Sequence, residues 1–87
     1  MALNSSKEYV SAADKGLGDR LLGATIHVNQ SKIAEFKEAH PDFAFPLSAV
    51  FTVTNISGEK CSIHYRDAVC QVEPKYFLTK NPEYRLY

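Results

Sequence analysis

Cysteine and histidine are the usual ligands of a structural zinc site, and this chain contains five of them. They are Cys61, Cys70, His27, His40 and His64. A zinc site needs four ligands around one ion, and close pairs of ligands usually supply them. Only Cys61 and His64 form a close pair, and residues three apart on a strand point to opposite faces. The spacing therefore predicts no metal site, and we expect no cofactor.

A cysteine triad can be written with Cys70, His64 and Asp67. A nucleophilic thiol, however, needs an electropositive and partly exposed position, and the apolar neighbours of Cys70 predict a buried strand face. The glycines Gly16 and Gly18 lack the spacing of a phosphate-binding loop. No acidic residues are paired by the sequence for acid-base chemistry. These observations favour a protein that is not an enzyme.

Charge argues against a dedicated nucleic-acid-binding protein. Ten Lys and Arg balance ten Asp and Glu among 87 residues, so no net charge attracts phosphates. The C-terminal tail is the exception, because it interleaves basic and aromatic side chains as single-strand binders do. The residues concerned are Lys75, Tyr76, Lys80 and Arg85. The same alternation is typical of an edge strand, so single-stranded nucleic-acid binding is our alternative hypothesis.

An apolar segment, Phe43-Ala44-Phe45-Pro46-Leu47, lies where a polar loop would be expected. Its rings either close the core or anchor a partner protein. Together with two tail tyrosines, they make up the predicted partner-binding residues, which are Phe43, Phe45, Tyr84 and Tyr87. We therefore predict a small protein-interaction module, such as an inhibitor or adaptor of the phage, plasmid or immunity type. It would act by covering a partner surface, and we also expect self-association as a homodimer.

Helical spacing of apolar residues dominates the chain before Pro46. Ser5 and Glu8 have the spacing of a capping box, which predicts a helix start. This helix either ends near Lys15, with Gly16 in the left-handed closing position, or continues to Leu21. Its apolar stripe is Tyr9, Ala13, Leu17 and Leu21. A strand is predicted over residues 24–28.

A second helix is predicted over residues 32–40. Asn29 and Ser31 are its candidate N-caps, and Ile33 and Phe36 its buried side chains. Pro41 would end it, because proline disfavours helical conformation in the preceding residue.

Alternation with a period of two follows Pro46 and predicts strands. Asn55-Ile56-Ser57-Gly58 has the residues of a type I turn closed by a left-handed glycine. This turn pairs Val53 with Cys61 and Phe51 with Ile63. One face then collects Ala49, Phe51, Val53, Cys61, Ile63 and Tyr65. Cys70, in the strand that follows, is also predicted to lie on this buried face.

The alternation shifts by one residue after Tyr65. Either a two-residue turn at Arg66 and Asp67 or a bulge in one long strand explains the shift. Pro74 ends this strand. Residues 76–79 and 84–87 are possible edge strands on either side of an Asn81-Pro82 turn.

These elements predict one small α+β domain over residues 1–87, with two layers. N-terminal helices would pack on a C-terminal antiparallel meander of three or more strands. No apolar run is long enough to span a membrane and the first residues do not resemble a secretory signal, so we expect a cytoplasmic protein. No motif is specific enough to assign a family.

Overall fold

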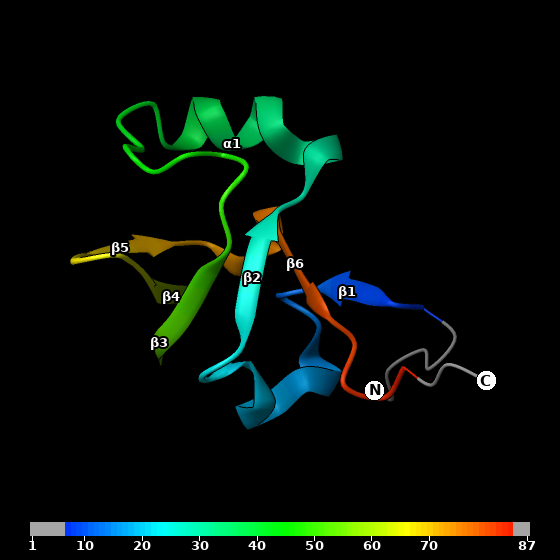
Figure 1. Ribbon diagram of the computed structural model, residues 1–87. Helices are drawn as coiled ribbons and strands as arrows, with labels where there is room; N and C mark the ends of the chain where they lie inside the picture. Colours follow the sequence, from blue (N-terminus) through cyan, green and yellow to red (C-terminus); the bar gives the residue numbers. More distant parts are fainter. Residues whose placement is uncertain (1–6, 85–87) are drawn as a thin grey trace.

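A computed structural model describes residues 7–84, in which one antiparallel sheet is accompanied by short helices (Figure 1). The strands are β1 Tyr9–Ser11, β2 Thr25–Val28, β3 Phe51–Ser57, β4 Lys60–Tyr65, β5 Ala68–Val72 and β6 Phe77–Lys80. The α-helix is α1 Ile33–Ala39, and the 3-10 helices are η1 Lys15–Leu21, η2 Gln30–Lys32 and η3 Pro74–Tyr76. The α+β class is therefore confirmed.

The sheet has the strand order β1-β6-β2-β3-β4-β5. The strands β3, β4 and β5 form the predicted meander, but the sheet is not confined to the second half, because β1 and β2 also belong to it. The edge position predicted for residues 76–79 is wrong, since β6 pairs with β1 on one side and β2 on the other. Phe77 and Thr79 are buried there, and a strand between two neighbours satisfies the backbone groups on both of its sides.

The helix predicted from Ser5 and Glu8 is absent from the described residues, and Ser5 itself lies outside them. Tyr9 begins strand β1 and is 46% exposed, whereas Val10 is buried. The short apolar pattern fits both periods, and pairing with β6 decides for the strand. The helical turn comes later, where the Asp14 carboxylate accepts a hydrogen bond from the Gly16 N–H at 2.8 Å. Gly18, rather than Gly16, has the positive φ, +52°.

The helix predicted over residues 32–40 is present as α1, but neither Asn29 nor Ser31 caps it, because its N-cap is Lys32 without a side-chain hydrogen bond. Asn29 caps η2 through a hydrogen bond that its side-chain oxygen accepts from the Ser31 N–H at 3.1 Å. The helix α1 follows directly and ends before Pro41. Phe36 on its buried side is fully enclosed, and its ring centroid lies 5.3 Å from that of Phe77. This contact holds α1 against the sheet.

The register predicted for the β3–β4 hairpin is wrong by two residues. Val53 pairs with Ile63 instead of Cys61, and Ser57 pairs with Lys60. The loop therefore consists of Gly58 and Glu59, with Gly58 at φ +60° as the first residue of a type II′ turn requires. A shift of two keeps Val53 and Ile63 on their predicted face. Beyond a bulge between Val53 and Asn55 the pairing shifts by one further residue, so that Asn55 pairs with Ser62.

The two-residue turn at Arg66 and Asp67 is the alternative that the structure contains. Tyr65 pairs with Ala68 and Ile63 pairs with Cys70, without a register shift. Arg66 accepts a φ of +54° to make this turn.

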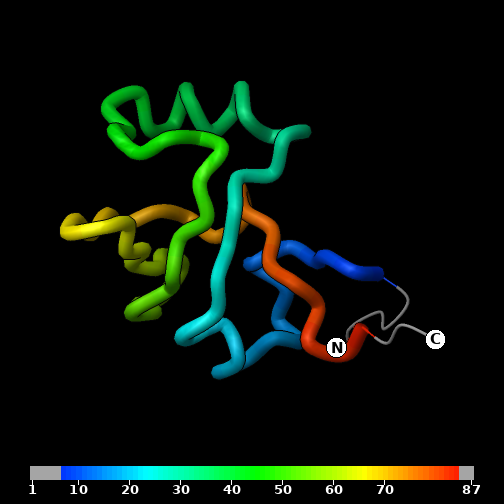
Figure 2. The backbone as a smooth tube through the Cα atoms, viewed as in Figure 1, coloured from blue at the N-terminus to red at the C-terminus, as the bar shows by residue number. Residues whose placement is uncertain are grey.

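One face of the sheet carries the core. Its fully buried side chains include Phe36, Phe51, Phe77, Ile26, Ile63, Val28, Val53 and Val72. The backbone trace shows η1 before β2 and α1 after it, at opposite ends of that strand (Figure 2). Among residues 7–84, no helix is long and apolar enough to cross a membrane.

Candidate binding groove

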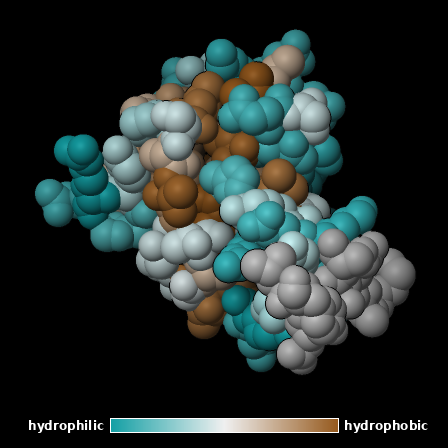
Figure 3. Space-filling view, turned by 45° about the vertical axis from the view of Figure 1, so that its right-hand side comes forward, coloured by the Kyte–Doolittle hydropathy of each residue, from teal (hydrophilic) through white to brown (hydrophobic). Residues whose placement is uncertain are grey.

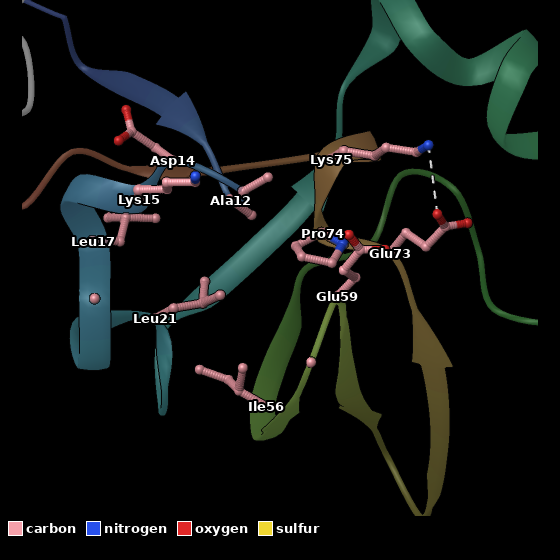
Figure 4. Close-up of a pocket in the computed structure, with 13 residues that line it drawn as sticks. Ala12, Asp14, Lys15, Leu17, Leu21, Ile56, Glu59, Glu73, Pro74 and Lys75 are labelled. Carbon is pink, nitrogen blue, oxygen red and sulfur yellow. Dashed lines mark ion pairs between the residues drawn. The ribbon is translucent and has the colours of Figure 1, made fainter. Parts of the chain in front are cut away.

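A groove of about 540 Å³ opens between η1, the β3–β4 turn and the corner that joins β5 to η3 (Figure 4). We call it the η1 groove. Its floor is apolar and consists of Ala12, Leu17, Leu21, Ile56 and Pro74. The charged residues of its lining, which we call the rim, are Asp14, Lys15, Glu59, Glu73 and Lys75, and Figure 4 shows the paired heads of Glu73 and Lys75 directed away from Leu21 and Ile56.

The floor depends on an irregularity in β3. The register shift between Val53 and Asn55 turns Ile56 toward the core face, where it pairs with Cys61. Leu17 and Leu21, on either side of a kink at Gly18 in η1, are buried on the opposite wall. Figure 4 shows Leu21 and Ile56 reaching into the groove from the two sides. Ile56 remains 40% exposed, so an apolar side chain on the floor is accessible.

The rim has both paired and unpaired charges. Lys75 Nζ lies 3.5 Å from a Glu73 carboxylate oxygen and 5.2 Å from the centre of the Tyr76 ring. The Glu73 carboxylate, and after it Tyr76, raises the pKa of Lys75. Across the groove, Lys15 and Glu59 have no ion pair among residues 7–84. Among the described residues, the rim therefore has one ammonium group, that of Lys15, and two carboxylates, those of Asp14 and Glu59, outside any ion pair, and the Asp14 carboxylate accepts the hydrogen bond from the Gly16 N–H.

The lining of the groove has the composition of a binding site. Apolar floors with a few polar groups at the margin are typical of ligand and peptide sites. Within the described ranges, no three His, Cys, Asp or Glu side chains gather in a way that could hold a metal ion. The groove lining contains no histidine, cysteine, serine or threonine.

The cysteines occupy different environments. Cys61 is 1% exposed, and burial raises the pKa of its thiol to about 11. Cys70 is only partly buried, so the prediction of burial is met fully by Cys61 alone. His64 and Cys70 lie on opposite faces of the sheet, because Cys70 pairs with Ile63 and His64 pairs with Val69.

A second hollow of about 250 Å³ is bordered by Cys70 and His40. His40 Nε2 lies 3.8 Å from a Glu73 carboxylate oxygen, beyond hydrogen-bond distance. This hollow thus contains a thiol and an imidazole from distant parts of the chain.

The two predicted aromatic anchors pack against the core. Phe43 and Phe45 are partly buried. The ring centroid of Phe43 lies 4.8 Å from that of Phe36, and the centroid of Phe45 lies 5.4 Å from that of Tyr65. Their role in a protein interface stays a prediction, but their packing already gives them a structural role.

The tail residues do not form one exposed basic and aromatic surface within residues 7–84. Tyr76 is buried, Lys75 pairs with Glu73, and Lys80 is exposed at the end of β6. Tyr84 is partly buried, and its N–H donates to the Asn81 carbonyl at 3.1 Å. The remaining predicted residues, Arg85 and Tyr87, lie outside the described part of the chain.

Sequence reasoning missed the groove. It placed Ile56 inside a turn and Leu17 on an apolar stripe of helical spacing, and it had no reason to bring either near Pro74. The sequence could have shown that Ile56 belongs to a strand rather than to the turn. Gly58 followed by Glu59 also predicts a two-residue hairpin loop, because glycine is favoured at its first position.

Comparison with known proteins finds no family model, no curated protein and no solved structure that matches this chain. The chemistry of the groove is therefore the basis for a functional assignment.

Proposed function

We propose that this protein is a small interaction module of the inhibitor or adaptor type, and that its η1 groove binds a short segment of a partner protein. The segment inserts one apolar side chain between Leu21 and Ile56, and its polar neighbours meet the rim. The observation that carries the proposal is an accessible apolar floor inside a rim of mixed charge.

A protein segment fits this site better than nucleic acid does. Phosphate groups need an excess of positive charge, whereas the rim includes three carboxylates and two ammonium groups. One of these ammonium groups, that of Lys75, is already paired. The free Lys15 and Glu59 suit a segment that carries both charges beside its apolar anchor.

We prefer the groove to residues 43–47 as the interface because the Ile56 side chain on the groove floor is 40% exposed. Phe43 and Phe45 contact other rings of the core and are partly enclosed. Figure 3 shows one face of the molecule, where apolar residues reach the surface among hydrophilic ones.

The test begins with peptides selected from a random display library on the full chain. Affinities of the selected peptides are then measured for the protein and for Ile56→Asp. A carboxylate on the groove floor should weaken binding by about 2 kcal/mol or more, because it would be buried without a partner.

Val50→Asp is the matched control. Val50 directly precedes β3, is apolar and 59% exposed, and does not line the groove. Its affinity should equal that of the unaltered protein. Equal loss in both variants, or no loss in Ile56→Asp, would place the binding surface outside the groove.

A further inference from the structure

The free side of β5 lacks the features that usually protect an edge strand. The strand pairs with β4 along its whole length without a bulge, and no strand in residues 7–84 pairs with its other side. Edge strands commonly carry charges, prolines or bulges that prevent pairing with another chain. The sequence of β5 is Ala-Val-Cys-Gln-Val, with neither charge nor proline, and Val69 is 61% exposed.

The turn before β5 determines which of its backbone groups are free. Tyr65 and Ala68 close a two-residue hairpin loop. Such a closing pair exchanges two hydrogen bonds, and so does every second pair after it. The N–H and C=O groups of Val69 and Gln71 therefore face away from β4. Glu73 continues the same phase, because its backbone is extended with φ −89° and ψ 120°.

We propose that β5 pairs antiparallel with β5 of a second copy of this chain, about a two-fold axis at Gln71. This register opposes Val69 to Glu73 of the second copy and Gln71 to its own equivalent. All the free backbone groups then find partners. Pro74 lies opposite Ala68 of the second copy, and this pair exchanges no hydrogen bonds. The missing N–H of proline therefore removes no hydrogen bond from the interface.

The number of backbone hydrogen bonds selects this register over its neighbours. With the axis at Gln71, the outward-facing groups of Val69, Gln71 and Glu73 find partners among the same three residues of the second copy. With the axis at Cys70, Glu73 would face Asp67 of the second copy, which lies in the turn before β5, so the backbone groups of Glu73 would stay unpaired. The exposed Gln71 amide is self-complementary, because it has both donors and an acceptor. Two-fold symmetry is also the commonest arrangement of identical chains.

The side chains agree with this pairing on both faces. Cys70 meets Val72 of the second copy on the core face, so the two cores become continuous. On the outer face, the exposed Val69 comes to lie within the interface, while the Glu73 carboxylate stays beside Lys75 and His40 of its own chain. A contact through one strand is at the small end of specific interfaces, so the dimer should form reversibly and depend on concentration.

The test is sedimentation equilibrium of the full chain at micromolar to millimolar concentrations, with two lysine variants. Gln71→Lys places two ammonium groups together on the axis and should weaken the dimer by about ten-fold or more. Val69→Lys places its ammonium group opposite Glu73 of the second copy and should leave the dimer intact. Thr52→Lys, at an exposed position inside the sheet, is the control for added charge.

A cross-linking measurement checks the axis independently of these variants. With Cys61 and Cys70 replaced by alanine, Gln71→Cys should oxidise to a covalent dimer, whereas Val69→Cys should not. A monomer at every concentration would overturn the proposal. So would a dimer that Val69→Lys disrupts and Gln71→Lys does not, because that result requires an axis at Val69.

Discussion

Asn81 shows how a single buried amide can join the two ends of the described chain. Its side-chain N–H donates to the Lys7 carbonyl at 2.8 Å, and its side-chain oxygen accepts from the Glu83 N–H at 2.9 Å. Asn81 is 2% exposed, so both bonds are shielded from water. The sequence predicted a turn at Asn81 and Pro82, and this turn is confirmed. The long-range bond to Lys7 has no local signal in the sequence.

Replacing Asn81 by alanine should lower the free energy of unfolding by about 2 kcal/mol, because two backbone groups lose a buried partner. Urea unfolding followed by circular dichroism measures the change. Asn55→Ala, at an exposed asparagine, should change the stability by less than about 0.5 kcal/mol. Equal effects of the two variants would contradict the role assigned to the Asn81 amide.

The Cys61 thiol predicts a dependence of stability on alkaline pH. Its pKa rises from 9.0 to about 11 because burial disfavours the thiolate. A group whose folded pKa is raised contributes its full stability below the unfolded pKa and loses it as the pH rises through the folded pKa. The contribution is therefore complete below about pH 9 and lost toward about pH 11.

Between pH 8 and about pH 10.5, the free energy of unfolding should fall by about 2 kcal/mol more for the unaltered protein than for Cys61→Val. The comparison removes the effects of tyrosines and lysines that titrate in the same range. Parallel pH profiles of the two proteins would show that the thiol is not shielded.

At the scale of elements, the Arg66 turn contains the one positive φ among the described non-glycine residues. A side chain in this conformation costs about 1 kcal/mol, and glycine avoids the cost. Arg66→Gly should therefore raise the free energy of unfolding by about 0.5–1 kcal/mol. The variant also loses the contact between the guanidinium and the Tyr65 ring, 5.5 Å from its centre, which reduces this gain. Asp67→Gly should instead lower it, since Asp67 has a negative φ. Urea midpoints distinguish the two, and destabilisation by both would refute strain at Arg66.

The elements that the sequence predicted correctly have local causes. Asn29 caps the short helix η2, and Pro41 follows the end of α1. The shift of alternation after Tyr65 marks the turn at Arg66 and Asp67, which was one of the two alternatives that the sequence left open. The helix expected near Glu8 failed because its few apolar residues fit two periods, and a strand 70 residues later decided between them. The β3–β4 register failed because Asn55 and Gly58 offer competing turns within four residues, and a bulge in β3 favours the later one.

At the scale of the whole molecule, rings from separate segments form a continuous aromatic cluster. Phe45 contributes contacts with Phe43, Phe51 and Tyr65, at centroid distances of 5.4, 5.7 and 5.4 Å. Phe45→Ser should lower the free energy of unfolding by about 2–3 kcal/mol and leave groove binding unchanged. Thermal unfolding and peptide affinity measure the two effects, with Ala44→Ser as an exposed control. An unchanged melting temperature with lost binding would instead support Phe45 as the partner anchor.

The groove could not be predicted from the sequence because it exists only in the assembled chain. Its walls come from η1, from the hairpin tip and from the corner after β5, and the strand order that brings them together depends on β6 lying between β1 and β2. The individual residues carry no motif. Charge balance and the lack of catalytic spacing could be read from composition, and these favoured binding over catalysis.

The most direct test of the η1 groove is an NMR titration of the isotope-labelled chain with a display-selected peptide. The amide signals of Leu17, Ile56 and Glu59 should shift together as the groove fills. Shifts centred instead on Val50 and His64, on the opposite face of the sheet, or on Phe43 and Phe45 would contradict the account.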